Sequence, residues 1–218
     1  MNAVHRVALI LLAASAVAAS GQSPIAVERD GVLVVEAETF SRQKLSEIRR
    51  WRLTSEDFQP DAKPDLDPPH MEGASGGAYV ELLPDTRTTH DDRLIRGENF
   101  TNTPGEMAVL EYDVRFTTPG RYYVWVRAYS SGTEDNGIHV GLDGEWPESG
   151  ARMQWCEGKK TWRWESKQRT EEEHCGVEGL IYLDVRSAGD HTVMFSMRED
   201  GFEMDQWRMT LKKGDRPE

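Results

Sequence analysis

The sequence predicts an all-β protein, a β-sandwich of jelly-roll type, from two observations. From Ala108 to Phe116 apolar and charged residues alternate strictly, which is typical of a half-buried strand in an antiparallel sheet. Elsewhere short strand-like segments alternate with turn signals, and helical periodicity is scarce. Many short strands without intervening helices favour two packed sheets.

The predicted strands follow one another along the chain. Apolar and β-branched content, bounded by turn residues, places them at 32–39, 78–82, 108–116, 122–129, 137–142, 180–185, 191–197 and 204–211. Residues 42–69 are polar and carry four prolines, which predicts a long surface excursion with a short helical turn near 45–51.

The first twenty residues are typical of a secretory signal peptide. Arg6 precedes an apolar run, 7–19, that is too short to span a membrane as a helix, and small residues follow it. We therefore expect a signal peptide over 1–20 and a secreted or periplasmic β-sandwich domain over 24–213, without membrane insertion.

The chain is strongly acidic, with a formal net charge of −12 that becomes −13 once Arg6 is removed. A net anion is repelled by nucleic acids and by anionic membrane surfaces, so both are disfavoured as partners. The charge does not disfavour neutral sugars.

Cys156 and Cys175 are the chain's two cysteines. In an exported protein such a pair predicts a disulfide. Two free buried thiols are the alternative. The spacing is not that of a zinc site.

Three acidic residues fall where strands are expected to turn apolar side chains inward. Glu36 and Glu38 share the parity of Val32 and Val34 in the first strand, and Asp205 shares the parity of the apolar residues of the last strand. A buried carboxylate needs a partner or a metal, and oxygen ligands from different strands suit Ca²⁺. The alternative is that one or two of these acids point outward at a strand end.

A sugar ring stacks its C–H face on an aromatic ring, while its hydroxyl groups need polar partners. Trp155, Trp162 and Trp164 lie among basic residues in the segment 151–175, so we expect them to contact a glycan, although one of them is expected in the core. Loops between strands supply the other candidate ligand-binding residues, which are Glu134, Asp135, Asn136, Arg198 and Asp200. A solvated turn explains the three residues 134–136 equally well. Arginine near tryptophan, with Arg127 as an outward candidate, would suit an acidic sugar.

Five segments carry a family resemblance: VVEAETF at 34–40, SGGAYVEL at 75–82, FTTPGRYYVWVRAY at 116–129, AGDHTVMFSMREDG at 188–201 and FEMDQWRMT at 202–210. In this order they resemble the galactose-binding-like carbohydrate-binding modules of families 6 and 35. They are also similar to the C-terminal module of family 115 glycoside hydrolases and to agarase-associated domains.

The resemblance implies a galactose-binding-like jelly roll that binds a polysaccharide or oligosaccharide and can accompany secreted glycan-degrading enzymes. It also implies a structural Ca²⁺ held by Glu36, Glu38 and Asp205. Relatives often place an asparagine in the loop before the last strand, whereas this chain has Arg198, Glu199, Asp200 and Glu203 there. That departure leaves the sugar specificity open.

A catalytic role has little support in the sequence. The pattern G-x-S-x-G occurs at 73–77 (GASGG), but it precedes a predicted strand, whereas a nucleophile elbow follows a strand and opens a helix. The acidic run 171–173 is typical of a solvated surface. A lyase could use His139, His174 or Tyr129 as a base. A small polysaccharide-degrading enzyme and a structural envelope protein therefore remain as alternatives to a non-catalytic module.

Overall fold

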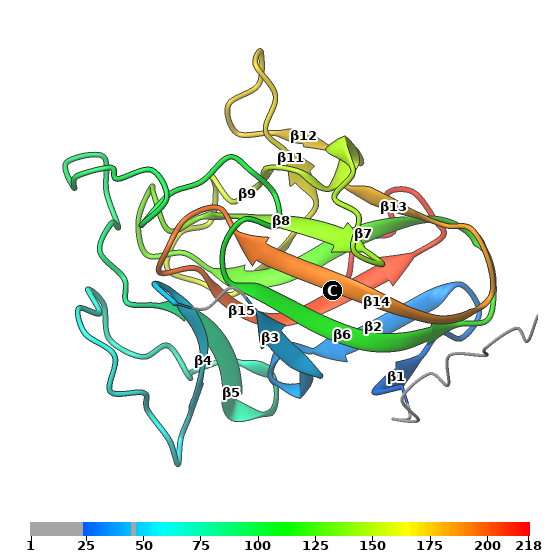
Figure 1. Cartoon of the computed structure of the whole chain (residues 1–218), viewed down its shortest axis with the longest axis horizontal. Coiled ribbons are helices and arrows are strands. Elements are labelled where there is room, and N and C mark those ends of the chain that lie inside the picture. Colours follow the sequence, from blue (N-terminus) through cyan, green and yellow to red (C-terminus); the bar gives the residue numbers. More distant parts are fainter. Residues whose placement is uncertain (1–23, 45–46) are drawn as a thin grey trace, which may run out of the picture.

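The computed structural model describes residues 24–44 and 47–218; the predicted signal peptide lies outside these residues. The described residues form two β-sheets and three short 3-10 helices (Figure 1). The 3-10 helices are η1 (Ala37–Thr39), η2 (Ser75–Gly77) and η3 (Glu148–Gly150).

Sheet A contains eight strands in the order β1-β6-β14-β8-β9-β11-β12, with β3 paired to β6. Its strands are β1 (Ala26–Val27), β3 (Arg42–Lys44), β6 (Val109–Phe116), β8 (Gly137–Leu142), β9 (Met153–Gln154), β11 (Lys167–Gln168), β12 (Val177–Glu178) and β14 (Gly189–Met197). Sheet B contains seven strands in the order β10-β7-β15-β5-β4, with β13 paired to β7 and β2 to β15. Its strands are β2 (Val32–Glu36), β4 (Arg50–Ser55), β5 (Ala78–Leu83), β7 (Gly120–Tyr129), β10 (Arg163–Glu165), β13 (Tyr182–Val185) and β15 (Glu203–Thr210).

Long strands that follow one another in the chain alternate between the sheets. β6, β8 and β14 belong to sheet A, whereas β7, β13 and β15 belong to sheet B. This alternation, with almost entirely antiparallel pairing, is the arrangement expected of a jelly roll. The predicted fold class is confirmed.

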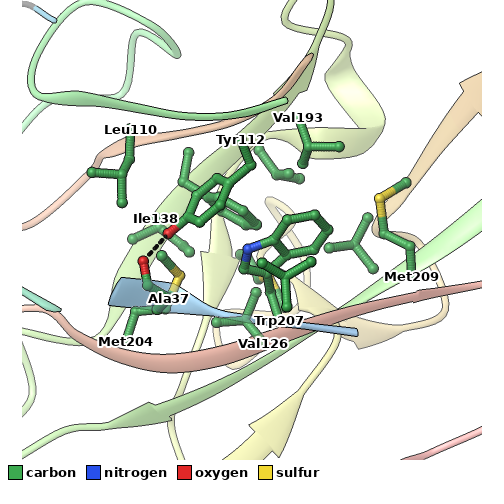
Figure 2. Close-up of a cluster of buried hydrophobic side chains, with 14 of the residues drawn as sticks. Ala37, Leu110, Tyr112, Val126, Ile138, Val193, Met204, Trp207 and Met209 are labelled. Carbon is green, nitrogen blue, oxygen red and sulfur yellow. Dashed lines mark hydrogen bonds between the residues drawn. The ribbon is translucent and has the colours of Figure 1, made fainter. Parts of the chain in front are cut away.

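The core lies between the two sheets and contains large aromatic side chains from both. The ring of Tyr112 on β6 meets Trp207 on β15 edge to face (Figure 2), with centroids 5.1 Å apart. The ring of Phe195 on β14 lies 5.6 Å from that of Trp207. The hydroxyl of Tyr112 donates a hydrogen bond of 2.7 Å to the carbonyl oxygen of Ala37, so its one polar group is satisfied. These contacts fasten the sheets together.

The predicted inward parity of the first strand is wrong. Leu33, Val35 and Ala37 are buried in the core, whereas Val34 is 49% exposed. Glu36 and Glu38 therefore lie on the opposite parity and point away from the core. The sequence VLVVE is apolar on both parities over four residues, so alternation alone could not select the inward set.

A β-bulge in β15 explains a second parity error. Met204 pairs with Ala128 and Gln206 pairs with Arg127, which leaves Asp205 as the extra residue. Because of the bulge, Met204 and Trp207 both reach the core although they are three positions apart. Asp205 consequently forms an ion pair with Arg127, a residue of the sheet's outer face, and does not share the direction of Trp207.

The predicted surface excursion over 42–69 is wrong in part. It contains β3 and β4, and β4 pairs antiparallel with β5 over its whole length. Arg50 and Trp51 begin β4 where a helical turn was expected. Only residues 56–77 form the long loop, apart from the single 3-10 turn η2.

No helix within residues 24–44 and 47–218 is both long enough and apolar enough to cross a membrane.

Candidate functional site

The outer face of sheet B carries the candidate site. Val126 and Ala128 of β7, Val80 and Leu82 of β5, and Met204 of β15 point into the core. Alternation directs their neighbours to the other face of the sheet. These outward residues are Arg127, Tyr129, Tyr79, Glu81, Glu203 and the bulged Asp205.

The loop 56–77 folds back over this face. The backbone amide of His70 donates to the Tyr79 hydroxyl (3.1 Å), Arg127 donates to the carbonyl oxygen of Gly73 (2.9 Å), and the amide of Ser75 donates to Asp205 (2.8 Å). The loop thereby covers part of the polar face of the sheet. A cavity remains between the loop, β7 and the segment 160–162.

This cavity, the aromatic pocket, has a volume of about 440 Å³. Its lining combines aromatic rings with both signs of charge. The lining residues are Pro69, His70, Glu72, Gly73, Arg127, Tyr129, Lys160, Thr161 and Trp162.

The rings of the aromatic pocket are held by contacts with one another. Trp162 meets Tyr129 and Tyr79 edge to face, at centroid distances of 5.5 and 5.2 Å, and its indole N–H donates to the carbonyl oxygen of His70 (3.0 Å). The imidazole of His70 stacks on Tyr129 with centroids 3.8 Å apart. Such rings are positioned before any ligand binds, which lowers the entropic cost of stacking a sugar on them.

Trp162 is the predicted platform residue that the structure places in a pocket. Trp155 is 1% exposed and packs against Phe202 in the core, at a centroid distance of 4.9 Å. Trp164 is 8% exposed, on β10 opposite Arg127, and Arg216 of the C-terminal tail donates to its carbonyl oxygen (3.3 Å). Both residues are buried, so neither offers a ring face to a glycan, and this part of the platform prediction is corrected.

The loop residues predicted to bind ligand divide into two groups. Asp135 accepts hydrogen bonds from Ser130, Ser131 and Gly132, so it closes its own loop. Asn136 bonds to Gln154 and to the carbonyl oxygen of Thr133. Asp200 is fully buried, where it accepts from Arg49 and Thr86. These three carboxylate and amide groups are structural, which corrects the prediction that they face a sugar.

Glu134 and Arg198 line a second cavity, of about 540 Å³, which we call the arginine cavity. Five arginines face it together with three glutamates, and two of those glutamates already pair with arginine: Glu134 with Arg87, and Glu199 with Arg198. The arginines are Arg87, Arg96, Arg152, Arg169 and Arg198. The structure therefore separates the predicted ligand residues into two cavities.

The predicted disulfide between Cys156 and Cys175 is confirmed. It closes the ends of the segment that carries Trp162, so the loop cannot swing freely away from β7. Closing a loop of this length restricts the unfolded chain by about 3 kcal/mol in the loop-entropy model.

The three acids predicted to hold Ca²⁺ are neighbours beside β15, and we call them the carboxylate trio. They are not among the groups of described residues whose ligand atoms lie within 4.8 Å of one another. Ser75 joins two of them: its hydroxyl donates to Glu36 (3.0 Å) and its amide to Asp205 (2.8 Å). Burial raises the pKa of Glu38, and the charges of Glu36 and Asp205 raise it further. One oxygen of Glu36 and one of Glu38 are buried without a hydrogen-bond partner.

Arg127 connects the carboxylate trio to the aromatic pocket. It pairs with one oxygen of Asp205 and lines the pocket beside Trp162, with its guanidinium carbon 5.9 Å from the ring centroid. Asp205 thus has a cationic partner, whereas the unpartnered oxygens belong to Glu36 and Glu38. The expected outward position of Arg127 is confirmed.

Sequence reasoning missed His70, Asp65, Asp67 and Glu81. The first three lie in the loop 56–77, whose prolines and charges predicted only a surface segment. Glu81 carried a usable signal, because it alternates with Val80 and Leu82 in a predicted strand and is therefore directed to the outer face.

The two histidines named as lyase bases are not in the aromatic pocket. His139 is fully buried, and burial lowers its pKa to about 3 while Arg152 donates its backbone amide to the ring. His174 faces the arginine cavity beside Arg169. Tyr129 lines the aromatic pocket, but burial raises its pKa, which reduces the fraction of phenolate that could act as a base.

The known proteins that resemble this chain include a curated sequence and several solved structures. No protein-family profile matches the sequence. It is 57% identical over 189 residues to the Uncharacterized protein P23 of Formosa agariphila, a match that covers 87% of this chain and 46% of that protein. The chain thus spans about half the length of this curated relative.

Solved structures with a similar arrangement include carbohydrate-binding modules. The C-terminal CBM6 of the marine laminarinase LamC from Zobellia galactanivorans is 15% identical, covering 82% of this chain and 98% of that chain with a TM-score of 0.42. The CBM35 from Paenibacillus barcinonensis is 16% identical with the same two coverages and a TM-score of 0.44. A Paenibacillus xanthan lyase is 13% identical, covering 89% of this chain and 14% of that chain with a TM-score of 0.47.

Proposed function

We propose that this protein is a secreted, non-catalytic carbohydrate-binding module that takes a polysaccharide or oligosaccharide in the aromatic pocket. The observation that carries the proposal is the position of Trp162: it is half-buried, held by two tyrosines and lines a cavity next to Arg127 and Lys160. An aromatic ring beside directed polar groups is the chemistry that a sugar requires, because one face of the sugar is apolar and its rim is hydroxylated.

The charges around the pocket favour an acidic glycan. Lys160 lines the aromatic pocket together with Glu72 and with Arg127, whose guanidinium already donates to Asp205 and to the carbonyl oxygen of Gly73. The separate arginine cavity carries five guanidinium groups, two of which are paired with glutamates. Guanidinium groups grip carboxylate or sulfate oxygens through paired hydrogen bonds. A uronic acid or a sulfated sugar is the ligand class that fits these side chains despite the net charge of −12.

Ca²⁺ at the carboxylate trio is part of this proposal. The two unpartnered buried oxygens of Glu36 and Glu38 fit a hard cation, and an ionised carboxylate such as Asp205 has more acceptor sites than its two present donors use. When bound, the ion would neutralise the repulsion among the acids. The chain's own contribution is to hold η1, η2 and β15 together beside the pocket.

Glycan retention tests the proposal directly. Affinity electrophoresis through alginate, pectin, carrageenan, laminarin and xylan would compare the wild type with Trp162→Ala, Trp162→Phe and Arg169→Ala. We expect the wild type to be retarded by at least one acidic polysaccharide, Trp162→Ala to lose retardation, and Trp162→Phe to keep part of it because a stacking ring remains. Loss in Arg169→Ala with normal retention in Trp162→Ala would move the site to the arginine cavity.

Catalysis is the competing outcome. Release of reducing ends or unsaturated products from any of these polysaccharides by the purified chain would contradict the non-catalytic assignment. Absence of retention on all of them would favour a structural envelope protein.

A further inference from the structure

A second group of acids lies on the outer face of sheet B, apart from the carboxylate trio. Asp65 and Asp67 come from the loop 56–77, Glu81 from β5 and Glu203 from β15. Asp65, Asp67 and Glu81 each place a ligand atom within 4.8 Å of the other two, and so do Asp67, His70 and Glu203. The two groups meet at Asp67, and Glu81 pairs with Glu203 in the sheet register, so the four acids are neighbours, which we call the acidic quartet.

The two glutamates of the quartet oppose each other directly across two paired strands. Glu203 pairs with Glu81 in the register of β15 and β5, and the residues are 1% and 3% exposed. Like charges at directly opposite positions destabilise a sheet, and burial increases the cost. The chain carries glutamate at both positions, although a glutamine at either one would remove the repulsion between the two carboxylates.

Each glutamate also has an unused oxygen. Oε1 of Glu81 and Oε2 of Glu203 are buried without a hydrogen-bond partner. A buried charged oxygen left unpaired costs several kcal/mol, so such atoms mark the place of a missing partner.

Within residues 24–44 and 47–218, two cationic side chains lie near the quartet, and neither forms an ion pair with Glu81 or Glu203. Arg52 lies opposite Glu81 in the register of β4 and β5. Lys63 lies 3.9 Å from Asp65, but its side chain is 70% exposed. His70 bonds to Glu203 at 2.7 Å, so its imidazole is already engaged by one of the four acids. An exposed lysine and one arginine do not balance four carboxylates.

We propose that Asp65, Asp67, Glu81 and Glu203 bind a divalent cation of the calcium class, at a site separate from the carboxylate trio. Four carboxylates provide the hard oxygen ligands that Ca²⁺ takes. The other polar neighbours hold the ligands: His70 positions Glu203, and the Ser131 hydroxyl donates to Asp67. The ion fastens residues 65–70 to β5 and β15, and this piece of chain carries the Pro69 and His70 wall of the aromatic pocket.

Calcium titration of the chelator-treated protein by calorimetry tests the site. The variants are Asp67→Asn/Glu81→Gln, which empties the quartet, and Glu36→Gln/Glu38→Gln, which empties the carboxylate trio. Both pairs of substitutions keep side-chain size and remove charge. We expect the Glu36→Gln/Glu38→Gln variant still to bind one Ca²⁺, and the Asp67→Asn/Glu81→Gln variant to bind one fewer than the wild type.

Two results would overturn the proposal. The first is an unchanged Ca²⁺ stoichiometry in Asp67→Asn/Glu81→Gln. The second is no Ca²⁺ binding by Glu36→Gln/Glu38→Gln folded to the wild-type circular dichroism spectrum, which decides the question even if the first variant does not fold. Binding of Zn²⁺ but not Ca²⁺, lost in His70→Asn, would likewise replace the oxygen site with a histidine site.

Discussion

At the scale of one residue, the buried carboxyl group of Asp85 makes the stability of the folded protein depend on pH. It is 1% exposed, and its oxygens accept hydrogen bonds from the Arg87 amide (3.1 Å) and the Thr88 hydroxyl (3.0 Å). Burial raises its pKa to about 7, and the charge of Asp200 adds to the increase. The folded protein therefore retains a proton that the unfolded chain has released.

The sign of the pH effect follows from this difference in protons bound. Because the folded pKa lies above the unfolded value of 3.8, the stabilisation is complete below pH 4 and is lost as pH rises to about 7. Asp85→Asn should remove that dependence. We expect urea unfolding in chelator to show a smaller fall in stability between pH 4.5 and 8 for the variant than for the wild type, by about 3 kcal/mol at most. Superimposable pH profiles would contradict this role for Asp85.

The role of a single residue was predictable from the sequence where the residue type alone determines its chemistry. It was not predictable where the role depends on how the residue packs in the folded protein. The disulfide prediction needed only the two cysteines and the predicted signal peptide. Among the tryptophans, by contrast, Trp155 entered the core and Trp162 the pocket although both stand among polar neighbours in the sequence. A residue's own neighbours along the chain do not show which tertiary surface will cover it.

At the scale of elements, the bulge in β15 and the loop 56–77 shape the candidate site on the outer face of sheet B. The bulge turns Asp205 outward beside Arg127, and η2 brings Ser75 onto both Asp205 and Glu36. Alternation predicted the long strands β6, β7, β8 and β14 because each has one apolar face. It did not predict the bulge, which adds one residue and reverses parity beyond it.

Removal of metal tests the element contacts at the carboxylate trio. In the Asp67→Asn/Glu81→Gln background, which isolates the trio, Ca²⁺ at 100 times its dissociation constant should stabilise the fold by about 2.7 kcal/mol. Adding Glu36→Gln/Glu38→Gln should abolish the calcium response in thermal melts. A melting temperature that is the same in Ca²⁺ and in chelator, before those last substitutions are added, would show that the trio holds no ion.

At the scale of the whole molecule, the inner faces of the two sheets form the core, and the outer face of sheet B carries the candidate sites. The inner faces pack Tyr112, Phe195 and Trp207 into one core, while the outer face of sheet B gathers the aromatic pocket, the carboxylate trio and the acidic quartet under a single loop. The β-sandwich was predictable because the alternation of apolar and polar residues that marks a strand is a local property of the sequence. The clustering was not, because it depends on contacts between residues such as Asp67 and Glu203 that are 136 positions apart.

The most direct test of glycan binding at this face is an NMR titration that follows the indole N–H signals of the seven tryptophans. Oligosaccharides from the polysaccharide that best retards the wild type would be the probe. We predict that the Trp162 signal shifts in proportion to binding, while those of the buried Trp51, Trp155 and Trp207 remain in place. A shift of Trp146, which lies at a cavity on the face of sheet A, with Trp162 unmoved, would contradict the account.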